Sequence, residues 1–242
     1  MEPHLIDDLA YKERFYWWHR VRRDNLLRLL GPTLDGCSRV LEIGSGTGAN
    51  LRAVRHRCGQ AIGLEIDFKA LGYCRDLTTI RADALEGLPF ADGVFDAIIL
   101  LDVLEHISET APLVSEMARV LRPGGKVLVM VPARPELWSY WDEMHGHHRR
   151  YTRKMLAGVF DASWALERLE YSFSWMYPVV WSFRTMMRRR RLADDHSDFI
   201  EVPLPVNSLL VFAGRLEVQL RSLVPIPFGT TLCGVWTRGR AR

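Results

Sequence analysis

The chain has 242 residues, of which 48% are hydrophobic and 25% charged, a composition typical of a soluble globular protein with a full core. Disordered, collagen-like and fibrous classes are therefore excluded. The 32 basic side chains exceed the 29 acidic ones by only three, so no global field attracts nucleic acid, and we expect no nucleic-acid partner. The positive excess is local, because Arg184 and Arg188–Arg191 lie in one short segment.

The cysteines and the first residues indicate a compartment. Cys37, Cys58, Cys74 and Cys233 are too far apart in sequence for the close pairs of a zinc site or a redox motif. Acidic residues stand near the start of the chain where a secretory signal would be apolar, and no stretch reaches the roughly 18 apolar residues of a spanning helix. We expect reduced thiols, no metal and a cytoplasmic protein.

The middle of the chain alternates short apolar runs with helical patterns, which is typical of βα units on a parallel sheet. The predicted strands are 39–43, 61–65, 78–81, 94–101 and 126–131. A short helix near 152–160, a strand near 165–173, a helix from Ser174, a helix after Pro205 and a strand at 230–236 are predicted to follow. The sequence thus predicts an α/β fold with a seven-stranded, mostly parallel sheet and helices on both faces.

No repeat or linker divides the sequence, so we predict a single domain over residues 1–242. Its predicted parts are an N-terminal helical cap (1–36), a cofactor-binding core (37–173), an amphipathic insertion (174–205), and a last helix and strand (206–242). In that last helix the apolar positions predicted to share one face are Leu209, Leu210, Ala213, Leu216, Leu220 and Leu223.

A glycine loop, Gly44-Ser45-Gly46-Thr47-Gly48, follows the first predicted strand. Glycines allow a tight turn and a close approach of the backbone to a ligand, and the N–H groups at a helix start favour a negative group. Gly44, Gly46 and Ala49 also satisfy the GxGxxG/A dinucleotide pattern, with Glu65 as the acid about 20 residues later. A nicotinamide site and a glycine turn without a ligand both stay open at this point.

The sequence VLEIGSGTG at 40–48 resembles the first motif of class I S-adenosylmethionine-dependent methyltransferases. The resemblance continues in order with GLEID at 63–67, ADAL at 82–85, FDAIILLDVLEHI at 95–107 and RVLRPGGKVLVMVP at 119–132. Such an ordered set favours this class over a nicotinamide enzyme. It implies the Rossmann-like class I methyltransferase architecture and S-adenosylmethionine as cofactor.

The resemblance also implies roles for single residues. Glu65 would accept hydrogen bonds from both ribose hydroxyls, because an ionised carboxylate has two acceptor oxygens. Asp83 would accept one from the adenine amino group, and Glu42 would support the loop. The expected cofactor set is Glu42, Gly44, Ser45, Gly46, Gly48, Glu65, Ile66, Asp83, Ala84, Leu101 and Asp102. We expect His106 and the turn Pro123-Gly124-Gly125 to be structural.

An acid, Asp142, precedes a G-H-x-R-R-Y-T block at 146–152, after the fifth predicted strand. This arrangement resembles a bacterial branch of these methyltransferases, and ubiquinone-pathway O-methyltransferases carry a looser analogue. A neutral imidazole can take a proton from a hydroxyl, so we predict His147 as the base, with Asp142 and Tyr151 as further catalytic residues. A loop held together by hydrogen bonds is the alternative, and a metal site of Asp142, His145 and His147 fits no standard spacing.

Two helices outside these motifs are predicted to border the site. The run Phe15–Trp18 followed by Arg20, Arg22 and Arg23 resembles a helix of the same branch that would cap the cofactor pocket, and an ordinary amphipathic helix is the alternative. The insertion combines tryptophan and methionine with Arg188–Arg191, which fits an interfacial helix at the inner face of an anionic membrane. Packing on the sheet or on the second subunit of a homodimer is the alternative.

The predicted function is methyl transfer from S-adenosylmethionine to an oxygen of a small or lipid-linked acceptor, such as a glycan or a quinone precursor. Base-methylating enzymes are disfavoured because LLDVLEH at 100–106 lacks their proline-proline-aromatic tetrad. A catalytically silent methyltransferase-like interaction protein and a nicotinamide-dependent oxidoreductase remain the alternatives.

Overall fold

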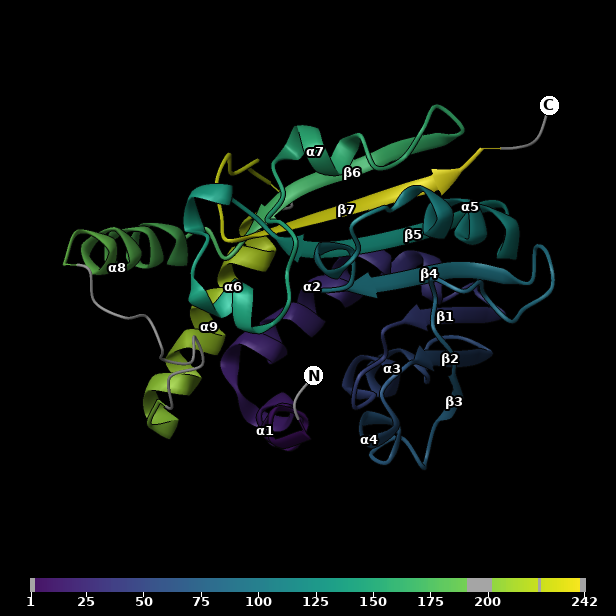
Figure 1. The fold of residues 1–242 in the computed structure, drawn as a ribbon, viewed down its shortest axis with the longest axis horizontal. Helices are drawn as coiled ribbons and strands as arrows, with labels where there is room; N and C mark the ends of the chain where they lie inside the picture. Colours follow the sequence, from purple (N-terminus) through teal and green to yellow (C-terminus); the bar gives the residue numbers. More distant parts are fainter. Residues whose placement is uncertain (1–2, 191–201, 222, 240–242) are drawn as a thin grey trace.

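The structure is a computed structural model that describes residues 3–190, 202–221 and 223–239. Seven strands form one sheet in the order β3-β2-β1-β4-β5-β7-β6 (Figure 1). The strands are β1 (Arg39–Ile43), β2 (Gln60–Glu65), β3 (Thr78–Arg81), β4 (Phe95–Leu101), β5 (Leu121–Pro132), β6 (Trp164–Ser172) and β7 (Thr231–Arg238). Only β7 runs antiparallel to its neighbours, β5 and β6. The predicted seven-stranded, mostly parallel sheet is therefore confirmed.

The central strand β4 shows why these segments form strands. Ile98 and Leu100 pack into the core on one face of the sheet, whereas Ala97 and Ile99 pack into the core on the other. Every residue of β4 is buried, which explains the continuous apolar run in the sequence. Helices cover both faces, as the sequence predicts.

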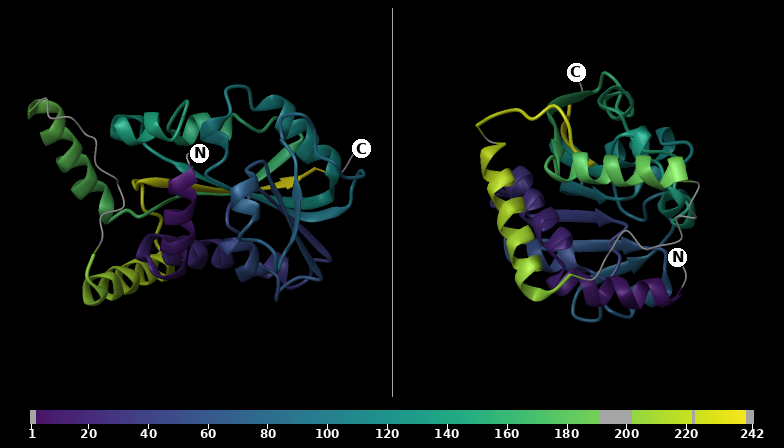
Figure 2. Two further views of the ribbon diagram at one scale, coloured as in Figure 1. Left: turned by 60° about the horizontal axis from the view of Figure 1, so that its bottom comes forward. Right: turned by 90° about the vertical axis from the view of Figure 1, so that its left-hand side faces the viewer.

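The helices divide between the two faces of the sheet. They are α1 (Pro3–Phe15), α2 (Trp17–Leu34), α3 (Ala49–Val54), α4 (Phe68–Leu71), α5 (Ala111–Val120), α6 (Tyr140–Met144), α7 (Arg153–Ala157), α8 (Met176–Arg190) and α9 (Leu204–Leu220), with 3-10 turns η1 (Leu104–His106) and η2 (Pro135–Leu137). Side chains of α2 and α3 share one core cluster, and those of α5 and α7 share the other. Figure 2 shows α9 alongside α2, whereas α8 projects from the body of the domain.

The fifth strand differs from its prediction. It begins at Leu121, directly after α5, rather than at residue 126. Leu121 pairs with Phe95 before a register shift, and Gly124 within this irregular stretch has a φ of +80°. The Pro-Gly-Gly segment is thus an irregularity inside the strand and not a turn that precedes it.

The leucine-rich face of α9 is not the face that packs on the domain. Leu209, Leu216, Leu220 and Leu223, which were predicted to share one face of the helix, are all exposed. The helix instead turns Gly214 toward α2, where an added Cβ would lie 2.4 Å from Val21 Cγ2. Close approach of the two helices requires a small residue at that position, and the leucine-rich face therefore points outward.

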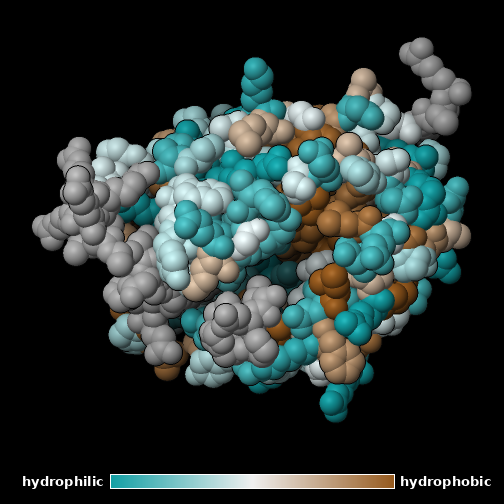
Figure 3. All heavy atoms as spheres, in the orientation of Figure 1, coloured by the Kyte–Doolittle hydropathy of each residue, from teal (hydrophilic) through white to brown (hydrophobic). Residues whose placement is uncertain are grey.

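A crossing without a helix joins β3 to β4. Ala82, Ala84, Phe90 and Val94 of this crossing pack against the core on the side of α5. Figure 3 shows apolar side chains over the middle of β4 and β5, on a face that is otherwise mostly hydrophilic. The crossing begins at Arg81, at the carboxyl end of β3. Ligands of open α/β sheets bind at this edge of the sheet.

Two findings concern the predicted insertion and membrane segments. None of the helices in the described ranges combines the length and the apolar character that crossing a bilayer requires. The insertion is described as α8 and the residues before it, whereas Arg191 and the side chains of Arg188–Arg190 lie outside the described residues.

Candidate active site

A cavity of about 1150 Å³ lies at the carboxyl ends of β1, β2, β3 and β4. Loops after these strands form its floor, and side chains of α1, α2 and α8 cover it. Most ligand pockets measure roughly 300–1,000 Å³, so this cavity has room for two ligands side by side. All the expected cofactor residues except Glu42 and Gly48 line it.

The glycine loop is shaped by left-handed backbone. Gly44, Gly46 and Gly48 have φ values of +70°, +53° and +82°. An added Cβ on Gly44 would lie 2.7 Å from Val103 Cγ2, so a larger residue would collide with the loop after β4. Gly48 is the N-cap of α3 and lies behind the cavity wall, where we expect it to shape the loop without touching a ligand.

Glu65 holds the glycine loop against β2. One carboxylate oxygen accepts a hydrogen bond from the Gly46 N–H at 2.7 Å, and the other accepts one from the Asp67 N–H at 2.9 Å. The side chain is nearly buried and still lines the cavity. Since a carboxylate has about four lone-pair sites, Glu65 can serve the loop and a ligand hydroxyl together.

Asp83 lies on the next loop of the same rim. Its Oδ1 accepts a hydrogen bond from the Leu85 N–H at 2.8 Å, which fixes the loop after β3. Ala84 and Ile66 line the cavity beside it, and the Ile66 side chain is largely exposed. An acceptor and two apolar groups therefore face the region where the predicted adenine would lie.

Glu42 lies near the end of β1, before the glycine loop, and does not line the cavity. Its side chain is buried, and its Oε1 accepts a hydrogen bond from Asn50 Nδ2 at 3.1 Å. Asn50 in turn lines the cavity. Burial raises the pKa of Glu42 to about 8, although the Asn50 hydrogen bond favours the charged form. Glu42 therefore links the end of β1 to the start of α3 through Asn50.

The N-terminal helices cap the cavity. Arg22 of α2 forms an ion pair with Asp102, and its guanidinium lies 4.4 Å from the centre of the Trp18 ring. Asp102 has a φ of +55°, a strained conformation for a non-glycine residue that its surroundings must hold in place. Trp17, Trp18, His19 and Arg22 line the cavity, as do Leu9 and Glu13 of α1, which sequence reasoning did not single out. The predicted cap is thus formed by two helices.

Asp142 contacts Ser139, His147 and Arg150 and does not line the cavity. Its buried carboxylate accepts hydrogen bonds from Arg150 Nε at 2.8 Å and from the Ser139 N–H at 2.9 Å, and contacts His147 Nδ1 at 3.0 Å. Burial alone would raise the pKa of Asp142, but the bonds from His147 and Arg150 lower it to about 2. Because an ionised carboxylate only accepts, Nδ1 of His147 donates the hydrogen bond, and Nε2 lies outside this contact.

Tyr151 does not lie where its predicted catalytic role requires. It is buried in the core, its hydroxyl donates a hydrogen bond to the Leu104 carbonyl at 2.9 Å, and it does not line the cavity. Burial raises the pKa of Tyr151 to about 12. The residue therefore ties the loop after β5 to η1, and we correct its role from catalytic to structural.

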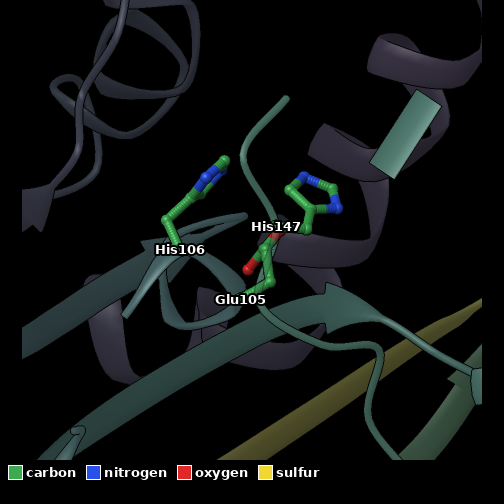
Figure 4. A group of neighbouring side chains, drawn as sticks. All are labelled: Glu105, His106 and His147. Atoms are coloured by element: carbon green, nitrogen blue, oxygen red, sulfur yellow. The ribbon is translucent and has the colours of Figure 1, made fainter. Parts of the chain in front are cut away.

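His106 was expected to be structural, and the structure places it in the cavity instead. Its ring centre lies 4.7 Å from that of His147, with the two planes nearly perpendicular. Burial and the neighbouring His147 lower the pKa of His106 to about 4, so the ring is neutral near pH 7. Glu105 lies beside both rings (Figure 4). The sequence LEH was interpreted only as the end of a cofactor motif, and its contact with the distant block at 146–152 has no local signal.

Comparison with known proteins agrees with this geometry. Residues 41–129 match the family model of the methyltransferase domain. Over 132 residues the chain is 33% identical to a demethylmenaquinone methyltransferase of Tropheryma whipplei, a segment that covers 52% of each chain. Over 125 residues it is 37% identical to a Mycolicibacterium smegmatis protein named as an S-adenosylmethionine-dependent methyltransferase, covering 50% of this chain and 48% of that one. The matched part spans about half the length of these curated relatives.

A solved S-adenosylmethionine-dependent methyltransferase of Archaeoglobus fulgidus has the same fold, with a TM-score of 0.57 and 17% identity over 95% of this chain and 99% of that chain. At this identity the likeness shows the fold alone, which is the Rossmann-like class I methyltransferase fold. Residues 41–129 are therefore similar to the methyltransferase domain family, and the fold of the whole chain agrees with that similarity.

The buried Glu42 gives the protein a measurable pH dependence. Burial raises the pKa of Glu42 from 4.5 to about 8, so between these values the folded chain keeps a proton that the unfolded chain releases. This group therefore lowers the free energy of unfolding as pH rises through that window, by about 1 kcal/mol per pH unit. Glu42→Gln cannot ionise and should gain stability over the wild type as pH rises. Urea unfolding at several pH values measures the difference. Glu143→Gln, an exposed control, should show no such trend, and parallel curves for Glu42→Gln and the wild type would contradict the prediction.

Proposed function

We propose that this chain transfers the methyl group of S-adenosylmethionine to an oxygen of a lipid-linked or other amphiphilic metabolite. The observation that carries the proposal is one continuous cavity, which joins the glycine loop and Glu65 to His147 and to the apolar side of α8. The cavity thus combines a cofactor end, a polar reaction centre and an apolar end.

The cofactor would lie across the carboxyl ends of β1, β2 and β3. Gly44–Gly46 would approach its methionine part, Glu65 its ribose and Asp83 its adenine, as the motif resemblance implies. Leu101 and Asp102 line the cavity past the end of β4, between this region and His106. The sulfonium and its methyl group would then point toward the two histidines.

The acceptor would enter along α8. Met176, Val179, Val180 and Phe183 of this helix line the cavity, and Val179 and Phe183 are also largely exposed. An apolar wall that continues to the surface suits an acceptor with a hydrocarbon part. A quinone-like acceptor is compatible with this shape, and the Tropheryma whipplei relative is named for a quinone substrate. The block at 146–152 supports placing the chain in the bacterial branch that carries it.

His147 would act on the acceptor hydroxyl as base or positioning group. Methyl transfer is an in-line displacement, so the enzyme must hold the acceptor oxygen opposite the sulfur and lose the hydroxyl proton. Nδ1 of His147 contacts Asp142, so Nε2 would be the nitrogen that accepts the proton. Asp142 would be a positioning residue, because it acts through His147.

We further propose a cytoplasmic protein whose α8 contacts the inner face of an anionic membrane. Trp181 and Met186 are exposed on this helix, and four arginines follow at 188–191 in the sequence. Aromatic rings and guanidinium groups suit the headgroup boundary of such a membrane. A second copy of the chain could cover the same apolar side chains, which would make a homodimer the alternative.

The cofactor assignment predicts the effect of Glu65→Ala. Loss of a charge-assisted hydrogen bond should weaken S-adenosylmethionine and S-adenosylhomocysteine by roughly 1.5–3 kcal/mol, about 10-fold to 150-fold in Kd. Isothermal titration calorimetry measures both, with circular dichroism to check the fold and the exposed Glu86→Ala as control. Unchanged affinity in Glu65→Ala would contradict the role of Glu65 and favour the silent alternative. Tighter binding of a nicotinamide dinucleotide by the wild type would favour the oxidoreductase alternative.

The reaction-centre assignment predicts the effect of His147→Ala. Transfer of labelled methyl groups to a lipid extract should fall by about 10² or more, while S-adenosylmethionine affinity stays nearly unchanged. His148→Ala, an exposed histidine of the same loop, is the matched control. If methyl transfer survives in His147→Ala and is lost in His145→Ala, His145 and not His147 is the base or positioning group. A silent interaction protein would show no transfer in the wild type.

The membrane proposal predicts the behaviour of the protein with vesicles. The wild type should float with liposomes that contain anionic lipid and not with neutral ones, because guanidinium groups bind phosphate headgroups. Replacing Arg188–Arg191 by serine should abolish flotation. If the wild type stays at the bottom of the gradient at low salt, packing of α8 within the protein or a dimer is the better interpretation, and analytical ultracentrifugation distinguishes the two.

A further inference from the structure

Three potential metal ligands meet at the polar centre of the cavity. Glu105 and His106 come from η1, directly after β4, and His147 comes from the loop after α6. One ligand atom from each lies within 4.8 Å of the other two. Figure 4 shows the Glu105 carboxylate between the two imidazole rings. Residues 41 positions apart in the sequence thus form one cluster.

Glu105 is the unusual member of this cluster. Its side chain is 0% exposed, and neither carboxylate oxygen has a hydrogen-bond partner among the described residues. Buried polar groups nearly always have a partner, and an ionised carboxylate without one is very costly. A bound cation would satisfy this carboxylate and would explain why it is placed beside two imidazoles.

The two histidines are prepared as ligands. Nδ1 of His147 contacts Asp142, which is held by Arg150, so its Nε2 is available. The His106 ring lies against the His147 ring, with the ring centres 4.7 Å apart, and it lines the cavity. Metal-binding histidines in proteins usually donate their second ring nitrogen to a carboxylate or a backbone carbonyl, as His147 does to Asp142.

The guanidinium groups of the cavity lining pair with carboxylates outside the cluster. Arg22 pairs with Asp102, whereas Arg150 and Arg184 share Asp142. None of these ion pairs uses the Glu105 carboxylate, so this carboxylate is left for a cation in the cluster.

We propose that Glu105, His106 and His147 bind one divalent transition-metal ion whose remaining coordination positions face the cavity. Two imidazoles and one carboxylate form the mixed nitrogen and oxygen ligand set that suits Mn²⁺, Fe²⁺, Co²⁺ or Zn²⁺ rather than Ca²⁺ or Mg²⁺. This proposal departs from the sequence-based expectation of no metal site, and its ligand set differs from the combination of Asp142, His145 and His147 considered from the sequence.

The role of the ion rests on the proposed function, whereas its binding does not. The acceptor hydroxyl would occupy an open position on the ion and release its proton to solvent, because a metal ion lowers the pKa of a bound hydroxyl. The resulting oxygen attacks the methyl carbon, and the C–S bond breaks with its electron pair remaining on sulfur. The products are the methyl ether, S-adenosylhomocysteine and one proton. His147 then acts as a metal ligand, and the ion replaces the imidazole as the group that activates the hydroxyl.

Cobalt binding tests the site without any turnover. The full chain is treated with a chelator, desalted and titrated with Co²⁺, whose visible absorption reports its ligands. We expect one Co²⁺ per chain and no thiolate charge-transfer band, since none of the four cysteines belongs to the cluster. Glu105→Gln and His147→Ala should each weaken binding by about 100-fold or more, since loss of a supporting residue alone costs 10-fold to 100-fold. His148→Ala should bind Co²⁺ like the wild type.

Glu105→Gln also tests the plain alternative, a protonated glutamate in the core. Glutamine mimics the neutral carboxyl, so unchanged Co²⁺ binding in this variant would overturn the proposal, as would absence of binding by the wild type. Thermal unfolding shows that each variant is folded. Calorimetry with S-adenosylmethionine on the same samples separates the two proposals: cofactor binding without Co²⁺ overturns only the metal site, and Co²⁺ binding without cofactor binding contradicts only the methyltransferase.

Discussion

The ion pair between Arg22 and Asp102 connects α2 to the carboxyl edge of the sheet, and both residues line the cavity. Exposed ion pairs contribute little to stability, but the Arg22 side chain is only 8% exposed, so loss of Asp102 would leave a nearly buried charge. The pair also holds Asp102 in its left-handed conformation. Because Leu101 precedes this residue and Glu105 follows it closely, one contact fixes the chain between the proposed cofactor residues and the proposed metal ligands.

Three buried carboxylates around the cavity differ in how completely they are satisfied. Asp142 contacts Arg150, Ser139 and His147 and is ionised, which makes it a fixed support. Glu42 has one bond from Asn50, and burial raises its pKa to about 8. Glu105 has none from any described residue. A group that the fold itself leaves unsatisfied indicates a ligand, whereas a fully bonded one indicates structure. This difference is why the inference about a cation rests on Glu105 and not on Asp142.

The sequence predicted the features that depend on short-range interactions, such as the strand positions. The strands were placed within about two residues of their observed bounds, except for β5, because buried parallel strands need continuous apolar runs. The glycine turn was visible because left-handed backbone favours glycine, and Glu65 was singled out by its spacing from that turn and by the motif resemblance. Tertiary contacts had no such signal: the choice of the Gly214 side of α9 depends on Val21, and the cluster of Glu105 with His147 depends on how two distant loops meet. Tyr151 was misassigned because a motif shows which residues occur together and not which of them face the cavity.

The arrangement of the cavity also constrains how an acceptor can bind. Its lining includes polar side chains such as His106, His147 and Arg184, and apolar side chains of α8. For the proposed amphiphilic acceptor, a hydroxyl at the histidines would form hydrogen bonds, whereas a hydroxyl against Val179 and Phe183 would find no partner on these two side chains. Hydrogen bonding would therefore favour the orientation that places the hydroxyl at the histidines. A cation at Glu105 would strengthen that selection, because it binds the hydroxyl oxygen and has no attraction for the apolar end.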